Sequence, residues 1–385
     1  MLVAAVLVAC GGGGGGGDTV AGIDGTGAPS PSPAAATVSV GTITAFGSVF
    51  VNGVRFETDS AEFEIDGESG TQDDLSVGDV VVVVGSLDDN DSTSGTADSV
   101  IFDDAVEGPV VSVDLAGNSL VVLGQTVRVS ANTTFDDSFA DPSLAGIMPD
   151  DIVEVSGLRA SDGSIEATRI EPKPASLEFE TTGFVSNLNA TTFNINALVV
   201  DYSAAMLNDF NGGAIANGDL VEVKGMNFAA GVLTATRVEF KGADIAADEG
   251  DRVEIEGFIT RFVDATDFDV SGLPVTTNGS TVYEGGSAAD LGLDIKVEAE
   301  GTIDANGVLV ATKIDIRRAS AVRLVALIDS VAPSGDSFIA LGITINVDEL
   351  TRIEDKSDMD MEPFSVGDLV AGNYVEVRGM EFPAG

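Results

Sequence analysis

Residues 221–238 read VEVKGMNFAAGVLTATRV, and this stretch decides the fold. Apolar and polar residues alternate in VEVKG and again after Gly231, which is typical of two half-buried β-strands joined by a turn. The stretch therefore predicts a β-hairpin whose turn closes at a glycine. Copies recur along the chain, loosely at 82–86, closely at 153–170 and 297–314, and with the first strand alone at 375–379.

The hairpin copies mark the period of an internal repeat. Their glycines are Gly85, Gly157, Gly225, Gly301 and Gly379, so the copies follow one another at steps of 72, 68, 76 and 78 residues. Upstream of each hairpin the same pieces return in the same order: a short strand, an apolar strand that often ends in a glycine turn, and a third strand. Between the second and third strands of the first repeat, Asn52-Gly53 is a strong signal for a two-residue hairpin.

Each repeat thus holds five strands, with a variable segment between the third and the fourth. In that segment residues 203–207 and 287–291 each predict one helical turn. Polar turns that lead into the fourth strand are expected at 78–79, 150–151, 218–219 and 367–368. Five strands in about 70 residues is the content of a small, partly open Greek-key barrel of the OB type. We therefore predict an all-β protein of tandem five-stranded OB-like barrels rather than open meanders, because domains must cover their sheet edges.

The last strand of each repeat changes phase within its length. Leu309 and Ala311 share one face of the predicted strand, whereas Ile314 and Ile316 have the opposite phase. A slip of one residue inside a strand predicts a β-bulge, here at the Ala-Thr-Arg or Ala-Thr-Lys step. Such a bend lets one strand take part in both halves of a barrel wall.

The charge balance is strongly acidic: 63 Asp and Glu stand against 18 Lys and Arg, for a formal net charge of −45. Proteins bind nucleic acid with Lys and Arg that displace counterions from phosphates, so we predict no nucleic-acid partner. The chain has no histidine and only one cysteine. Zinc sites, Ser-His-Asp triads, Cys-His pairs and an intrachain disulfide are therefore excluded.

The single cysteine ends a short apolar run at the start of the chain. Leu7-Val8-Ala9-Cys10 resembles the lipobox of bacterial lipoproteins, which implies a lipidated Cys10 and a membrane anchor. Gly11 in place of aspartate implies the outer membrane under the sorting rule of that family. No basic region precedes the apolar run, so we expect the true start to lie upstream. The Gly-, Pro-, Ser- and Ala-rich residues 11–37 predict a flexible tether.

The combined repeat pattern resembles a known bacterial family. Gly-x-Ile, Phe-x-Val-x-Gly, Gly-Asp, Val-Glu-Val-x-Gly and Ala-Thr-Arg-Ile together are similar to the repeats called domain of unknown function 5666. The likeness covers about residues 38–385 and is clearest in the second, third and fourth repeats. It implies OB-like domains, many of them behind a lipobox. Because that family has no established activity, the resemblance implies no catalytic residue.

The sequence divides into a signal, a tether and five repeats. The expected segments are a lipoprotein signal remnant at 1–10, the tether at 11–37, and repeats at 38–104, 105–173, 179–241, 251–317 and 319–385. In the fifth repeat the chain stops at the turn glycine, Gly385, before the last strand. We therefore expect the sequence to be a fragment of a longer protein.

Acidic loops are the only candidate sites that the sequence offers. The clusters are Asp88, Asp89, Asn90 and Asp91; Asp136, Asp137 and Asp141; and Asp355, Asp358, Asp360 and Glu362. Calcium takes roughly six to eight oxygen ligands, which such loops can supply, but none fits the EF-hand pattern. In a chain this acidic such clusters arise by chance. We therefore assign no metal ligand, no cofactor and no catalytic residue.

The predicted function is non-catalytic and sited in the bacterial cell envelope, with membrane attachment through Cys10. The first hypothesis is a binding or adhesion module for an envelope polysaccharide or protein, and the alternative is a passive spacer or envelope-assembly component. Oligosaccharide binding is weakened because the chain has no Trp and three Tyr. A carboxylate-based hydrolase ranks last because no pair of acids stands out. A groove shared by all repeats would favour binding, whereas outer faces that differ while core positions match would favour the spacer.

Overall fold

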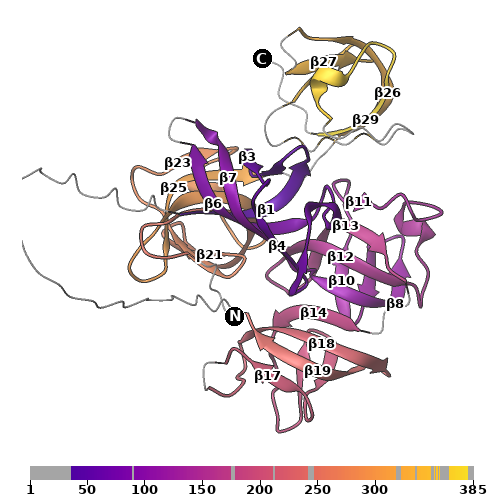
Figure 1. Ribbon diagram of the computed structural model, residues 1–385, viewed down its shortest axis with the longest axis vertical. Coiled ribbons are helices and arrows are strands. Elements are labelled where there is room, and N and C mark those ends of the chain that lie inside the picture. The colour runs from indigo at the N-terminus through magenta and orange to yellow at the C-terminus, as the bar shows by residue number, and fades with distance from the viewer. Residues whose placement is uncertain are drawn as a thin grey trace, which may run out of the picture. The chain divides into compact units, whose positions relative to one another are not determined.

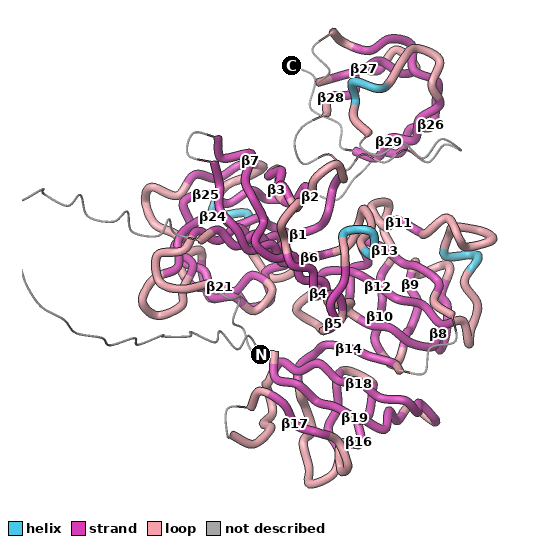
Figure 2. Tube along the Cα trace, in the orientation of Figure 1, coloured by secondary structure: helices cyan, strands magenta, loops and turns pink. Residues whose placement is uncertain are grey.

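The protein is described by a computed structural model, in which nearly every element is a β-strand (Figures 1 and 2). The described residues are 36–88, 91–174, 178–210, 213–241, 247–317, 322–333, 336–347, 351, 353, 355 and 364–379. Cys10 and the tether up to residue 35 lie outside them. No helix in these described ranges has the length and apolar character needed to cross a membrane.

The second repeat shows how each barrel closes. Its strands are β8 (Val106–Asp114), β9 (Ser119–Val122), β10 (Gln125–Arg128), β12 (Ile152–Arg159) and β13 (Ile165–Pro172). Strand β8 pairs with β9, β9 with β10, β10 in parallel with β13, β13 with β12, and β12 again with β8. In order along the chain, the strands therefore pair 1-2-3-5-4-1. This is a closed five-stranded Greek-key barrel of the OB type, and the predicted fold class is confirmed.

The first and fourth repeats have the same closed strand order, and in the third the first and second strands meet at the isolated bridge Ser186–Asn194 instead of in a ladder. The first contains β1 (Thr37–Ala45), β2 (Val49–Val51), β3 (Val54–Glu57), β6 (Val80–Asp88) and β7 (Asp91–Phe102). The third contains β14 (Phe179–Phe184), β15 (Thr192–Ile195), β16 (Leu198–Asp201), β18 (Leu220–Ala229) and β19 (Val232–Phe240). The fourth contains β20 (Arg252–Asp264), β21 (Asp267–Val270), β22 (Leu273–Thr276), β24 (Lys296–Ile303) and β25 (Leu309–Arg317). In the fifth, the described strands are β26 (Val322–Val331), β27 (Ser337–Ala340), β28 (Ile343–Asn346) and β29 (Tyr374–Gly379).

The predicted bulge is present in the closing strands. The register between the fourth and fifth strands slips beside Gly85, Gly157, Gly225 and Gly301. The slip also explains these glycines, because a backbone carbonyl of the bulged strand occupies the place of a side chain. A Cβ atom on Gly301 would lie 2.2 Å from the carbonyl oxygen of Val310, and one on Gly85 would lie 2.1 Å from that of Thr96.

The variable segment between the third and fourth strands holds short elements. They are the strands β4 (Glu62–Ile65), β5 (Glu68–Gly70), β11 (Thr134–Phe135), β17 (Met206–Asn208) and β23 (Val282–Glu284), and the 3-10 turns η1 (Gln72–Asp74), η2 (Leu144–Gly146), η3 (Ala288–Asp290) and η4 (Val366–Asp368). Of these elements, β4, β11, β17 and β23 pair in parallel with the closing strand.

Two sequence predictions in this segment were wrong. The helical turn expected at 287–291 is present as η3, but the one expected at 203–207 is absent, because β17 pairs there in parallel with β19. Gly367-Asp368 does not form the turn that leads directly into the fourth strand. It lies in η4, where Asp368 accepts hydrogen bonds from Ser365 in a capping box. The turn before β29 is at 372–373, and Asn373 accepts the Val370 N–H there at 2.7 Å.

Each barrel has an apolar interior built from alternate strand residues. Phe56, Phe193 and Phe268 are fully buried in the first, third and fourth repeats. The second and third repeats share one continuous apolar cluster, the cluster of the fourth repeat also includes Val38 of the first, and the first and fifth repeats each have a further cluster.

The repeats also join through their sheets, and not only in chain order. Strand β1 of the first repeat pairs in parallel with β20 of the fourth over Thr37–Val40, so these two barrels share one sheet. Strand β8 of the second repeat pairs with β14 of the third through Val106 and Glu107.

Candidate functional site

The glutamates of the Val-Glu-Val strands lie outside the barrel cores, as their alternation predicts, but they are not solvated. Glu154, Glu222 and Glu298 are at most 5% exposed. Each pairs with the base just after, or at the end of, the closing strand of its own repeat. The Glu154–Lys173 distance is 2.5 Å, the Glu222–Lys241 distance is 2.6 Å, and Glu298 bonds to Arg317. The outer faces of these hairpins are therefore buried, charged surfaces.

The first repeat departs from this pairing. Val82 stands where the other hairpins have glutamate, and Asp103 stands where they have Lys or Arg, as the strand register shows. Asp103 instead pairs with Lys241 of the third repeat at 3.2 Å. The first repeat therefore has no Lys or Arg at the end of its closing strand to pair with Asp103 or the adjacent Asp104.

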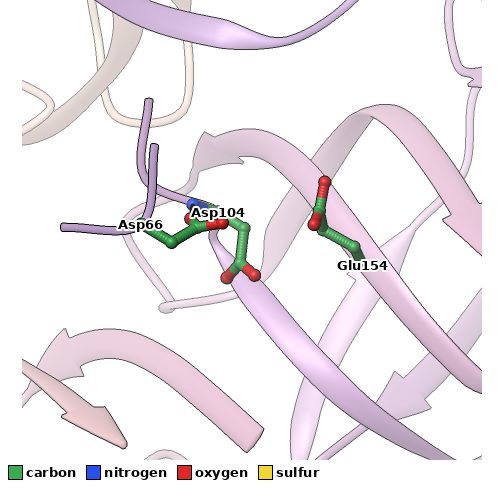
Figure 3. Close-up of side chains that lie close together, drawn as sticks. All are labelled: Asp66, Asp104 and Glu154. Atoms are coloured by element: carbon green, nitrogen blue, oxygen red, sulfur yellow. Dashed lines mark hydrogen bonds between the residues drawn. The ribbon is translucent and has the colours of Figure 1, made fainter. Parts of the chain in front are cut away.

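Asp66, Asp104 and Glu154 gather at this point (Figure 3). One carboxylate oxygen from each lies within 4.8 Å of the others, and this is the group of metal-ligating side chains found in the described part of the chain. Asp66 sits at the tip of the β4–β5 hairpin, where positive φ angles at Asp66 and Gly67 form the turn. Asp104 follows β7, and Glu154 lies on β12, so the first two repeats each contribute to the cluster.

Asp104 is the least satisfied member of the cluster. It is 3% exposed, and neither of its carboxylate oxygens has a hydrogen-bond partner. Its backbone N–H donates to Asp66 Oδ1 at 3.1 Å, which fixes the two aspartates side by side. A buried carboxylate without hydrogen-bond partners raises the free energy of the folded state. A proton, a bound cation or a rearranged neighbour would lower it.

Of the nearby bases, Lys173 pairs with one cluster member, Glu154, whereas Lys224 bonds to other groups, and Arg159 has an Nη1 without a partner. Lys173 lies between Glu154 and Glu171, at 2.5 and 2.9 Å. Lys224 bonds to Glu180 at 2.5 Å, to Glu222 at 3.0 Å and to the backbone oxygen of Asp66 at 2.8 Å. Arg159 donates to the backbone oxygen of Ala105 at 2.7 Å. Among the described side chains none forms an ion pair with Asp66 or Asp104.

The electrostatics of the cluster follow from burial and from this shortage of bases. Burial raises the pKa of Glu154 to about 9 even though Lys173 lowers it. Burial, followed by the charges of Glu180 and Glu154, raises the pKa of Asp104 well above its usual range, and burial raises that of Asp66. Two ionised carboxylates about 5 Å apart repel by roughly 3 kcal/mol at an effective dielectric constant near 20. The fully ionised cluster is therefore unfavourable without a counter-charge.

The family model described as domain of unknown function (DUF5666) matches residues 40–98, 107–171, 182–239, 256–315 and 326–385. The chain belongs to the DUF5666 family. A search of curated proteins found no match. Among solved structures, the chain is similar to drosophila Unr CSD456, at 16% identity over 56% of this chain and 98% of that chain, with a TM-score of 0.15. So weak a likeness carries no argument, and the barrel type of the DUF5666 repeats is taken from their strand order.

The acidic loops singled out from the sequence do not form the cluster. Asp136 bonds to Arg169 and to Ser138, and Asp141 accepts a hydrogen bond from Ser143 at 2.8 Å. Asp89, Asn90, Asp358, Asp360 and Glu362 lie outside the described residues, as does the lipidation candidate Cys10. Sequence reasoning missed Asp66, Asp104 and Glu154. The available signal was the loss of the basic residue at Asp103 in the first DUF5666 repeat.

Proposed function

We propose that the chain is a non-catalytic, lipid-anchored protein of the bacterial cell envelope whose DUF5666 barrels form a structural spacer. The observation that carries this proposal is a contrast between inner and outer positions on the second and third strands. Directly opposite residues on the outer face differ in every repeat. They are Phe50 and Arg55, Val121 and Thr126, Asn194 and Val199, Asp269 and Pro274, and Ile339 and Thr344.

The inner positions of the same strands stay apolar. The corresponding core pairs are Val49 and Phe56, Leu120 and Val127, Phe193 and Val200, Phe268 and Val275, and Phe338 and Ile345. In OB barrels the second and third strands and adjacent loops form the ligand-binding face. An array that gains avidity by repetition would keep this face alike in each repeat. Its variation supports a spacer over a repeated binding module.

Nucleic-acid and catalytic functions find little support in the described repeats. Single-strand binding uses a basic groove with stacking aromatics, whereas this chain carries a net charge of −45 and its buried bases are engaged in ion pairs. A glycosidase needs two carboxyl groups across a cleft that a sugar can enter. Asp104 is 3% exposed, and the cluster around it is closed to a substrate.

Attachment to the envelope rests on the lipobox-like Leu7–Cys10 and the tether behind it. Expression of the full chain in a bacterial host with a fatty-acid label should give a labelled protein in the outer-membrane fraction. The Cys10→Ala variant should be unlabelled and released from that fraction. A wild-type chain that takes up no label would overturn the anchor, and with it the location.

The spacer proposal is tested separately from the anchor. Purified full chain is titrated against peptidoglycan and against envelope polysaccharide, and no saturable binding is expected. Saturable binding that is lost when Thr126 and Val199 are replaced by arginine would overturn the spacer in favour of a binding module.

A binding or adhesion module remains the second candidate because of one observation in the fifth repeat. Leu327 and Tyr374 lie directly opposite each other on β26 and β29 and are 57% and 72% exposed. Exposed apolar residues that adjoin one another are typical of contact sites. If this pair binds an envelope component, the Leu327→Ser and Tyr374→Ser changes should abolish that binding without lowering the melting temperature.

A further inference from the structure

We propose that Asp66, Asp104 and Glu154 form a binding site for a hard divalent cation, calcium, and that the bound ion holds the first two repeats together. The inference is independent of the spacer function and concerns the cluster alone. It starts from donor type. All three side chains offer carboxylate oxygen, the ligand that Ca²⁺ and Mg²⁺ prefer, and histidine is absent from the chain.

The second step is the state of Asp104. Both of its oxygens lack a hydrogen-bond partner although the side chain is 97% buried, as its 3% exposure shows. In the close-up view it lies between Asp66 and Glu154 (Figure 3). Asp104 is buried beside two other carboxylates, and its lone pairs have no hydrogen-bond partner. These features are expected of a metal ligand. An ordinary buried aspartate has partners for both oxygens.

The third step is the charge around the cluster. The acids that surround it are Asp103, Glu107, Glu171, Glu180 and Glu222, and the bases are Arg159, Lys173, Lys224 and Lys241. Together with the three cluster members, the acids outnumber the bases. Lys173 pairs with Glu154 of the cluster, and Lys224 and Lys241 bond to glutamates outside it, so Asp66 and Asp104 have no lysine partner and a bound cation would supply the charge that they lack.

The choice of calcium follows from geometry. The three ligands come from a hairpin tip, a linker and a strand. They do not belong to one short loop that would hold them in an octahedral arrangement. Calcium accepts irregular sets of mono- and bidentate carboxylates, whereas magnesium keeps several waters and demands near-ideal geometry. Because Asp66 belongs to the first repeat and Glu154 to the second, an ion between them joins the two barrels.

The test is calcium titration of the full chain after treatment with a chelator, followed by calorimetry at roughly 0.15 M salt, which screens exposed carboxylates. We expect one saturable site. Asp104→Asn should weaken it by roughly tenfold or more, because affinity follows ligand charge. Asp66→Asn, at a less buried position, should weaken it as well and serves if Asp104→Asn does not fold.

The matched control is Glu254→Gln. Glu254 is also buried, at 4% exposed, and its Oε2 also lacks a hydrogen-bond partner, but it lies on β20 outside the cluster. We expect this variant to keep the wild-type calcium affinity. Loss of the site in Glu254→Gln, or its retention in both Asp104→Asn and Asp66→Asn, would overturn the assignment.

Thermal unfolding separates a ligand from a structural aspartate. Calcium should raise the wild-type melting temperature more than that of Asp104→Asn. In chelator the order should reverse, with Asp104→Asn melting above wild type, because the substitution relieves repulsion. Absence of any saturable site would overturn the proposal. Magnesium binding as tight as calcium binding would overturn the choice of calcium.

Discussion

The first repeat contacts the fourth and the second repeats in two different ways. Toward the fourth repeat, β1 and β20 pair along their backbones, so the two barrels share a sheet. Toward the second repeat, the described residues form no strand ladder, and the contact uses side chains. Ser156 Oγ accepts the Val80 N–H at 2.8 Å, and Arg169 lies 4.0 Å from Asp79.

The carboxylates at the two junctions differ in how they are satisfied. Glu256, at the shared sheet, bonds to Lys296 at 2.6 Å and accepts the Thr42 N–H at 3.0 Å and its hydroxyl at 2.7 Å. Asp104, at the other junction, has no partner for either oxygen. The shared sheet satisfies Glu256 but not Glu254 on the same strand, whose Oε2 also lacks a partner. A junction made of side chains alone gathers more charge than its own bases neutralise.

The largest effect is expected from removing Lys224, a base of the third repeat that also contacts the first repeat through the backbone oxygen of Asp66. Lys224→Met would leave Glu180 and Glu222 buried without their shared partner, which typically costs about 3–5 kcal/mol. Chemical denaturation of the full chain measures this loss. The matched control is Lys313→Met in the fourth repeat, where the pair with Glu284 is half-exposed and worth about 1 kcal/mol or less. Equal losses in the two variants would contradict this account.

A proline in β1 should disrupt the strand on which the shared ladder is built, through its pairing with β6. Ser39 lies opposite both Val83 of β6 and Glu254 of β20, so its strand is interior to the sheet. Ser39→Pro removes an N–H there and should cost about 3 kcal/mol or more. Ser39→Ala keeps the N–H and controls for the lost hydroxyl. If denaturation midpoints of the two variants agree, the backbone pairing of β1 at Ser39 contributes nothing to stability.

The pH dependence of Glu256 sharpens the comparison. Burial raises its pKa, but Lys296 and Thr42 lower it more, to about 2 from an ordinary value of 4.5. The folded state therefore binds fewer protons than the unfolded state between pH 4.5 and 2. The stabilisation is present above pH 4.5 and is lost as the pH falls toward 2, and it amounts to about 3 kcal/mol at neutral pH. Glu256→Gln should be less stable than wild type at pH 7, and the difference should shrink progressively below pH 4.5.

Glu254, two residues before Glu256, should respond in the opposite direction and more weakly. Burial and the charges of Glu298 and Glu300 raise its pKa to about 8. The folded state then binds more protons than the unfolded state between pH 4.5 and 8, so stability falls as the pH rises through this range. Glu254→Gln should be more stable than wild type at pH 8, by about 1 kcal/mol. A variant that is less stable at pH 8 and equal at pH 5 would show that the pKa is not raised.

The sequence by itself determined the repeat, the barrel and the bulge of the closing strand. These features are local, because alternation over a few residues sets which side chains face a core, and one slip in phase sets a bulge. The slip at Leu309–Ile314 was readable for this reason, and so was the hairpin at Asn52-Gly53, where both residues have positive φ. The prediction of a helical turn at 203–207 was wrong because pairing with β19 overrode a weak helical preference.

Only the tertiary structure decided which repeats contact one another and which side chains lie at those contacts. Thr42 and Glu256 are 214 residues apart in the chain, and no periodicity links them. The alternation in Val-Glu-Val places the glutamates outside the cores, but packing between repeats buries them. Asp66, Asp104 and Glu154 come from three segments, so their meeting depends on how barrels join. Patterns along a strand encode its two faces, and they carry no record of which other barrel will cover the outer one.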